Sequence, residues 1–254
     1  MSAGSRQRVA SVARALTLLD EVARSDAGLG VNELARRIGV NASTASRLLA
    51  TLEEGGLVER SADGPYRLGL KLVALSDRVL GQLDVRERAR PWLTWLVEET
   101  GETATLSVPG GGEAITVDFV PSSSSVVSMA RVGRPSVAHA TAAGKVMLAF
   151  GASGGDGGTE GELMAYTERT ITDRAALTAE LEAVRTSGIA EAVGEREPDL
   201  NALAAPVIGR GGELVAILGL QGPAARLPAS TRRALHAPLR RAASELGRSL
   251  GGPG

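Results

Sequence analysis

Residues 31–54 read VNELARRIGVNASTASRLLATLEE, and this stretch decides the fold of the N-terminal part of the chain. The apolar side chains of residues 31–38 recur on one helical face, and Gly39 suits the left-handed end of a short helix. Asn41 is a preferred N-cap residue for a following helix over 42–54. The buried face of that helix is predicted to carry Ala45, Leu48, Leu49 and Leu52. Two such helices joined by a glycine-centred turn are typical of a helix-turn-helix.

The flanking residues extend this motif on both sides. Upstream, apolar spacing predicts a helix that ends near Arg24, with a buried stripe of Val9, Val12, Leu16, Leu19 and Val22. Downstream, residues 57–60 and 66–68 are short extended runs, and the turn between them is rich in Asp, Gly and Pro. Three helices followed by a hairpin predict a winged helix-turn-helix. The alternative is a generic small helical domain with an incidental hairpin.

Beyond the hairpin the chain predicts a linker helix and then a second domain. Residues 70–83 are too apolar for a solvated helix, so this helix is expected to pack against another surface, such as its copy in a second subunit. Further helices are expected at 85–100, 140–150, 173–187 and 231–249, and strands at 103–108, 114–119, 126–131, 204–208 and 214–220. This pattern is typical of an α+β fold rather than a doubly wound parallel sheet. The predicted organisation is a DNA-binding domain over 1–69, a linker over 70–83 and a second domain over 84–254.

The composition excludes several classes of function. The chain has no cysteine and two histidines, so disulfides, thiolate or imidazole metal sites and thiol nucleophiles are disfavoured, and we expect no metal or cofactor. Aromatic residues make up 2% of the chain, which disfavours single-strand binding by base stacking and favours duplex. The net charge of −1 gives no further indication of DNA binding. No apolar run could span a bilayer and no signal segment begins the chain, so we expect a cytoplasmic protein with no membrane partner.

Three features resemble catalytic motifs only superficially. Gly144-Lys145 is not a phosphate-binding loop, because His139 stands where that motif needs glycine and Val146 where it needs Ser or Thr. His139 has no serine, cysteine or carboxylate at a spacing that would predict a triad, so a partly buried structural role is favoured over that of a general base. Residues 195–197, Glu-Arg-Glu, are interpreted as a solvated turn rather than as paired catalytic carboxylates. We therefore expect no enzymatic activity.

Short motifs distributed from Val9 to the C-terminus carry a family resemblance. They are SVARAL from residue 11, STASRLL from 43, YRLG from 66, TGETA from 100, HATAAGK from 139, TITD from 170, LAAPV from 203 and GP from 222. In this combination the chain resembles the isocitrate lyase regulator (IclR) family of bacterial transcription factors. The resemblance implies an N-terminal winged helix-turn-helix that binds operator DNA and a C-terminal GAF-like α/β domain that binds a small effector. It also implies a homodimer or homotetramer.

The residues expected to contact DNA lie mainly on the helix over 42–54. Arg47 has a planar fork suited to guanine or phosphate, and the resemblance places the matching arginine near DNA. Short hydroxyls suited to phosphates or base edges are Ser43, Thr44 and Ser46. The alternative is that these are ordinary solvated side chains, with Ser43 and Thr44 helping to cap the helix. The residues expected to neutralise backbone charge, or to be plain surface charges, are Arg36, Arg37, Arg60 and Arg67.

The resemblance also places an effector site between the second-domain sheet and residues 139–144. The residues assigned to that site are Ser128, His139, Ala142, Ala143, Ala192, Ala202, Gly219 and Gln221. Relatives that bind small oxo-acids have polar side chains at the last four positions, whereas three of those four are Ala or Gly here. A buried carboxylate would lack hydrogen-bond partners there, so we expect a larger or more apolar effector than glyoxylate or pyruvate, or other donors. The alternative is a domain that has lost ligand binding and serves assembly only.

The function predicted from these features is a metabolite-responsive, DNA-binding transcriptional regulator, and a repressor rather than an activator. Alternatives within the same family are a ligand-independent regulator and an activating one. An enzyme with an appended DNA-binding domain is disfavoured, because thiol redox chemistry on a GAF-like fold needs cysteine. A purely architectural DNA-binding protein is disfavoured because bending DNA does not need so large a second domain.

Overall fold

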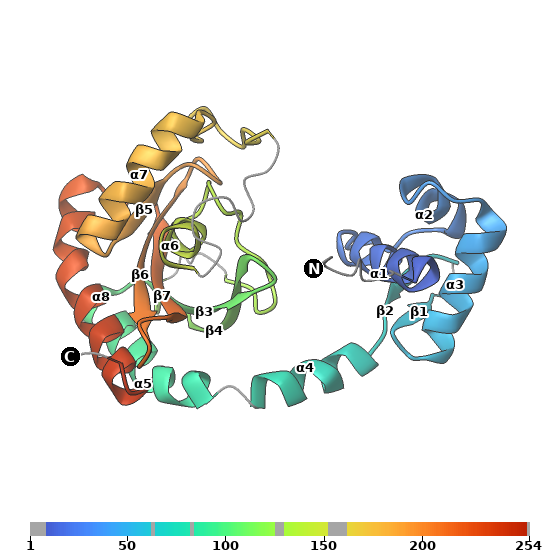
Figure 1. Cartoon of the computed structure of the whole chain (residues 1–254), viewed down its shortest axis with the longest axis horizontal. Coiled ribbons are helices and arrows are strands. Elements are labelled where there is room, and N and C mark those ends of the chain that lie inside the picture. The colour runs from blue at the N-terminus through green and yellow to red at the C-terminus, as the bar shows by residue number, and fades with distance from the viewer. Residues whose placement is uncertain (1–8, 62–63, 82–83, 125–129, 152–161, 253–254) are drawn as a thin grey trace, which may run out of the picture. The chain divides into compact units, whose positions relative to one another are not determined.

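The computed structural model describes residues 9–61, 64–81, 84–124, 130–151 and 162–252. Contacts within the chain divide it into two compact units, Met1–Gln82 and Leu83–Gly254 (Figure 1). The first unit contains α1 (Ala10–Ala23), α2 (Val31–Arg37), α3 (Ala42–Glu54), β1 (Val58–Arg60), β2 (Tyr66–Leu68) and α4 (Lys71–Gly81). This order confirms the predicted winged helix-turn-helix followed by a helix.

The core of the first unit joins the three helices to the hairpin. It consists of Leu18, Val22, Leu34, Leu49, Leu52, Val58 and Tyr66. Leu29 and Tyr66 exchange backbone hydrogen bonds of 3.1 and 2.8 Å, which attach β2 to the segment before α2. Gly28 makes this approach possible, because its φ is +79° and a Cβ there would lie 2.8 Å from the Tyr66 carbonyl oxygen. The hairpin is therefore held to the helical part of the unit by backbone hydrogen bonds as well as by the chain connections.

The predicted buried stripe of α1 is wrong for three of its five members. Leu18 and Val22 are the buried residues of α1, whereas Val9, Val12 and Leu16 are 62%, 56% and 58% exposed. The physical reason is that Leu18 lies about half a turn round the helix from Leu16, so α1 carries two apolar faces. One face packs on the core of its own unit and the other remains open in the single chain.

The second unit is built on a five-stranded antiparallel sheet. Its elements are α5 (Asp84–Thr100), β3 (Thr103–Gly110), β4 (Glu113–Val120), α6 (Ala142–Phe150), α7 (Arg174–Ser187), β5 (Ala190–Val193), β6 (Leu200–Ile208), β7 (Leu214–Pro223) and α8 (Ala229–Ser249). The strand order is β4-β3-β7-β6-β5. Helices α5 and α8 contact each other and the sheet. Helix α6 contacts the strands β4, β5, β6 and β7, and α7 packs against α6 (Figure 1). The predicted α+β class is confirmed.

Two strand predictions differ from the structure. The predicted strand at 126–131 falls mostly on residues 125–129, which lie outside the described residues, and Ala130 and Arg131 are not in a strand. Strand β5 was not predicted, because its sequence is only four residues long and mixes a glutamate with alanines. The omission matters, because β5 is the edge strand next to α6 and α7.

Neighbouring segments cover the outer edges of this sheet. At β4, the backbone N–H of Gly133 donates to Thr116 O (2.7 Å) and that of Ser136 donates to Ala114 O (2.8 Å). At β5, side chains bind backbone groups that a further strand would otherwise bind. Within the described ranges we find no helix with the length and hydrophobicity that a bilayer-spanning segment requires.

Candidate DNA-binding and effector sites

Helix α3 presents an exposed polar face. Its N-cap, Asn41, accepts hydrogen bonds at Oδ1 from the Thr44 backbone N–H (2.8 Å) and from Ser43 Oγ (2.9 Å). Ser43 and Thr44 thus take part in capping, as the alternative interpretation expected, which leaves Thr44 Oγ1 and the exposed Ser43 side chain at the helix start. A helix N-terminus presents free backbone N–H groups, a suitable partner for phosphate.

Ser46 and Arg47 follow on the same exposed face. Both are exposed, and Ala45 and Leu49 on the opposite face are fully buried. Among the residues that the structure describes, no ion pair or hydrogen bond engages the Arg47 guanidinium. Its five N–H donors therefore remain available for an external acceptor.

The two arginines of α2 are already engaged within the protein. Arg36 binds Glu33 in a bidentate pair (2.9 and 2.6 Å), and Arg37 binds Glu33 (2.8 Å) and Glu21 (3.2 Å). Hydrogen bonds from Arg36 and then Arg37 lower the pKa of Glu33 to about 2. Part of the positive charge of Arg36 and Arg37 is thus balanced within the protein, whereas Arg47 has no such pairing among the described residues.

The wing arginines differ from each other in their contacts. Arg67 is exposed on β2. Arg60 donates to Gly64 O (3.3 Å) and lies 5.8 Å from the ring centre of Tyr66. The hairpin therefore presents Arg67 more freely than Arg60.

In the second unit, the sheet register brings the predicted effector residues together. Ala192 of β5 is opposite Ala202 of β6, which is opposite Gln221 of β7, which is opposite Thr103 of β3. Directly opposite residues share a face, so this row crosses the sheet on one side. Gly219, two residues before Gln221, shares that face.

Helix α6 covers this row. Ala142 (2% exposed) and Ala192 (5% exposed) belong to one apolar cluster, and Ala143 and Ala202 pack against it. The wall that the resemblance assigned to the effector is therefore made of small apolar groups, with Gln221 as its polar member. Ser128 lies outside the described residues.

His139 is held by internal contacts. It is 7% exposed, its Nε2 is 2.9 Å from Met164 O, and its ring centre is 6.0 Å from that of Tyr166. The Arg196 guanidinium lies over the ring of Tyr166, 4.2 Å from its centre. These contacts match the structural role favoured from the sequence and join the segment before α6 to residues 164–166.

The most buried charged group of the described residues is not among those predicted from the sequence to be functional. Lys145 on α6 is 1% exposed, and its Nζ donates to Glu195 Oε1 (2.8 Å), Glu191 O (2.8 Å) and Glu180 Oε1 (3.0 Å). The interpretation of Glu195 as part of a solvated turn is wrong, because this residue is 7% exposed and paired. A lone lysine among the apolar residues of AAGKVMLAF was the available signal, since a buried ammonium needs an acidic partner.

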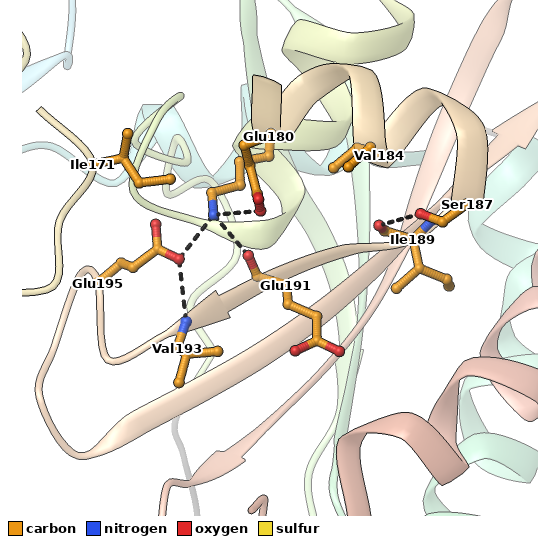
Figure 2. Close-up of a pocket in the computed structure, with 10 residues that line it drawn as sticks. Ile171, Glu180, Val184, Ser187, Ile189, Glu191, Val193 and Glu195 are labelled. Carbon is orange, nitrogen blue, oxygen red and sulfur yellow. Dashed lines mark hydrogen bonds and ion pairs between the residues drawn. The ribbon is translucent and has the colours of Figure 1, made fainter. Parts of the chain in front are cut away.

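The network of Lys145, Glu180 and Glu195 binds backbone groups on the outer edge of β5 (Figure 2). Alternate residues of an edge strand point their backbone groups away from the sheet, and in β5 these include Glu191 and Val193. Lys145 donates to the Glu191 carbonyl, and the Val193 N–H donates to Glu195 Oε1 (3.3 Å). Just before the strand, Ser187 Oγ bonds both the N–H and the carbonyl of Ile189.

The side chain of Glu191 has a separate environment. Arg232 Nε and His236 Nε2 of α8 each lie 2.7 Å from its carboxylate. Burial raises the pKa of Glu191, but hydrogen bonds from Arg232 and His236 together bring it below its usual value. Glu191 therefore joins three elements, with its carbonyl bound from α6 and its carboxylate bound from α8.

A groove of about 350 Å³ opens between α7 and β5 beside this network (Figure 2). It is lined by Lys145, Ile171, Glu180, Ala183, Val184, Ser187, Ile189, Glu191, Val193 and Glu195. None of the residues predicted to bind the effector is among them. In the described part of the chain we find no cluster of three His, Cys, Asp or Glu side chains suited to a metal ion.

Comparison with known proteins places both units in one family. Residues 11–62 match the family model of the IclR helix-turn-helix domain, and residues 77–248 match that of the bacterial transcriptional regulator IclR C-terminal domain. The chain is 32% identical to the HTH-type transcriptional regulator XynR of Escherichia coli K12 over 248 residues, 96% of this chain and 98% of the relative.

Solved structures agree with this assignment. A crystal structure of a putative IclR transcriptional regulator from Silicibacter sp. TM1040 is 30% identical, has a TM-score of 0.83 and covers 96% of this chain and 97% of its own. An IclR homologue from Microbacterium hydrocarbonoxydans, crystallised in complex with 4-hydroxybenzoate, is 25% identical with a TM-score of 0.76, over 95% of this chain and 99% of its own. The chain therefore belongs to the IclR family of DNA-binding bacterial transcriptional regulators.

Proposed function

We propose that this regulator is a repressor that binds a duplex operator through α3 and the wing and responds to a small metabolite bound in its second domain. The observation that carries the DNA part is the exposed face of α3, where Ser46 and the unengaged Arg47 lie next to the capped N-terminus. Arg47 is assigned to base or phosphate contact, Ser43, Thr44 and Ser46 to phosphates or base edges, and Arg36 and Arg67 to the DNA backbone. We propose a cytoplasmic location, because that is where a bacterial operator is found.

The effector is proposed to lie against the row of Ala192, Ala202, Gly219 and Gln221, beside Ala142 and Ala143. Small apolar side chains in that wall favour a ligand with an apolar body, because among those four row residues Gln221 is the one whose side chain could donate to the carboxylate of a compact oxo-acid. The relative that binds 4-hydroxybenzoate supports an effector of this larger and more apolar type. We propose no catalytic role for this protein. His139 is hydrogen-bonded to Met164 O, and the relatives of the chain are transcriptional regulators.

The protein is proposed to act as a homodimer. A helix-turn-helix reads one half-site, so tight operator binding calls for two copies. In the single chain, residues 9–16 and 70–75 leave large apolar side chains open, which a second copy would cover. They are Val9, Val12, Leu16, Leu70, Val73 and Leu75, between 46% and 79% exposed. A tetramer would add a second interface to this one.

The experiment for the DNA function is selection from a random duplex library with the purified protein. We expect enrichment of an inverted repeat whose half-site centres lie about one helical turn apart, or a multiple of that distance. Binding to the enriched duplex is then measured by fluorescence anisotropy with and without metabolites. If no sequence is enriched over the starting library, operator binding by this chain is refuted.

A charge on the open face of α1 should separate the subunits. Leu16→Glu places a carboxylate in the proposed interface without disturbing the core, because Leu16 is 58% exposed in the single chain. We expect a shift from dimer to monomer in sedimentation equilibrium and weaker operator binding. Thr17→Glu, an exposed polar position on the same helix, is the matched control and should remain dimeric. A Leu16→Glu protein with the native association constant would rule out this face as the interface.

Filling the apolar row should block the effector while sparing DNA binding. Ala202→Trp adds an indole where a packed interior has little free volume. Because the DNA-binding helix lies in the other unit, we expect native operator affinity but loss of the response to an effector found by a thermal-shift screen. The same substitution at the exposed Ala237 of α8 is the control. A response of native size in folded Ala202→Trp, checked by circular dichroism, would place the effector elsewhere.

A further inference from the structure

We propose that the groove between α7 and β5 binds a small organic cation, a primary ammonium carried on an apolar chain or ring. This groove is separate from the row of Ala192, Ala202, Gly219 and Gln221 proposed for the effector, since none of the predicted effector residues lines the groove. It would give the second domain two ligands of different chemistry. The inference depends on the groove alone and not on the proposed function.

The charge balance in the groove favours a cation. Lys145 provides one positive charge, and it is shared by the carboxylates of Glu180 and Glu195 at 3.0 and 2.8 Å. The carboxylate of Glu191 takes no part in this balance, because Arg232 and His236 already bind it. Two carboxylates thus share one ammonium, and a monovalent cation would neutralise the remaining charge.

A buried carboxylate oxygen in the groove wall lacks a donor. Glu195 is 7% exposed, and its Oε1 binds Lys145 and the Val193 N–H, whereas Oε2 is buried with no hydrogen-bond partner in the described part of the chain. A buried polar atom without a partner is unfavourable, and for a charged group the cost is greater. In Figure 2 this oxygen points toward Ile171, which also lines the groove. An ammonium N–H would provide the missing donor.

The remaining lining determines the body of the ligand. Apolar side chains make up half of the wall, namely Ile171, Ala183, Val184, Ile189 and Val193. A volume of about 350 Å³ is at the lower end of the range for small-molecule pockets, which suits one ring or a short chain. An alkyl- or arylammonium meets both requirements, with its head at Glu180 and Glu195 and its body along α7. A metal ion fits less well, since the described residues hold no group of three His, Cys, Asp or Glu side chains that could ligate one there.

The test is isothermal titration of the full-length protein, without DNA, using 2-phenylethylammonium chloride as the probe. We expect saturable one-site binding, and at least tenfold weaker binding of the neutral 2-phenylethanol. Ala183 is exposed on α7 and lines the groove, so Ala183→Trp should fill the groove without disturbing the core and weaken binding at least tenfold. Ala179→Trp, exposed on the same helix but outside the lining, should bind as the native protein does.

Two substitutions test the role of charge. Glu180 is partly exposed, so Glu180→Gln should preserve folding, and Glu195→Gln changes the buried carboxylate of the network. Both substitutions should weaken binding of the probe at least tenfold and leave binding of 2-phenylethanol unchanged. Several outcomes would overturn the proposal: no saturable binding of the probe, equal binding of the alcohol, or native affinity in Ala183→Trp or Glu180→Gln. Because the measurement contains no operator, a failure here leaves the DNA-binding function intact, and the library selection can fail independently.

Discussion

Lys145→Ala should lower the free energy of unfolding of the second unit by about 3–5 kcal/mol. The substitution removes the ammonium that binds Glu195, Glu180 and the Glu191 carbonyl, and it leaves the carboxylate of the buried Glu195 without its cation. For a domain of this size the loss corresponds to a decrease in melting temperature of about 6–20 °C. Differential scanning calorimetry measures it directly.

The double variant Lys145→Met, Glu195→Leu separates the two roles of this network. If the cost of Lys145→Ala comes only from an uncompensated charge, replacing both partners by apolar groups should restore most of the stability. We expect incomplete recovery, with a remaining deficit of about 1–3 kcal/mol, because the Glu191 carbonyl and the Val193 N–H also lose their partners. Full recovery in the double variant, or native stability in Lys145→Ala, would refute the edge-binding role.

Arg47→Ala should weaken binding to the selected operator by about 1–3 kcal/mol per half-site if the guanidinium reads a base. The reason is that Arg47 is exposed on α3 and makes no ion pair in the described part of the chain, so its whole donor set is available. Discrimination between operator and random duplex should fall with the affinity. Fluorescence anisotropy on both duplexes measures the two losses.

Salt dependence distinguishes a base contact from a phosphate contact. If Arg47 binds phosphate, the loss should be equal on both duplexes, and the slope of log K against log salt should fall by about one per contact. Arg36→Ala removes the same charge from a side chain already paired with Glu33, so this control should have a smaller effect on both duplexes. Unchanged binding of Arg47→Ala to operator and random duplex alike would contradict both roles.

The DNA-binding half of the fold follows from local sequence signals. Asn41 as N-cap and the glycines after residue 54 set the bounds of the helix at 42–54, which is the range that α3 occupies. Local capping and turn chemistry depend on residues within one turn of each other, so the sequence carries them directly. The open face of α1 was mistaken for a buried one, because a sequence pattern shows that a stripe is apolar but not what covers it.

The second unit depends more on contacts between distant residues, and there the sequence was less informative. The register that aligns Ala192 with Ala202 and Gln221 involves strands up to about 30 residues apart, and β5 was too short to be recognised. Lys145 and Glu195 are 50 positions apart, so each looked like an isolated charge until the fold paired them. The family resemblance assigned an effector to the row of Ala192, Ala202, Gly219 and Gln221 but gave no indication of the groove between α7 and β5.

The covered edges of the sheet have a consequence for how copies of this domain can assemble. Lys145 and Glu195 bind backbone groups on the outer edge of β5, Ser187 binds those of Ile189 just before it, and residues 133–136 bind those on the outer edge of β4. A strand from another molecule would have to displace these bonds before it could extend the sheet, so continuous intermolecular sheets are disfavoured. In the proposed homodimer, contacts between copies are therefore expected to use side chains on helices and loops. At high concentration the same feature protects the protein from edge-to-edge aggregation.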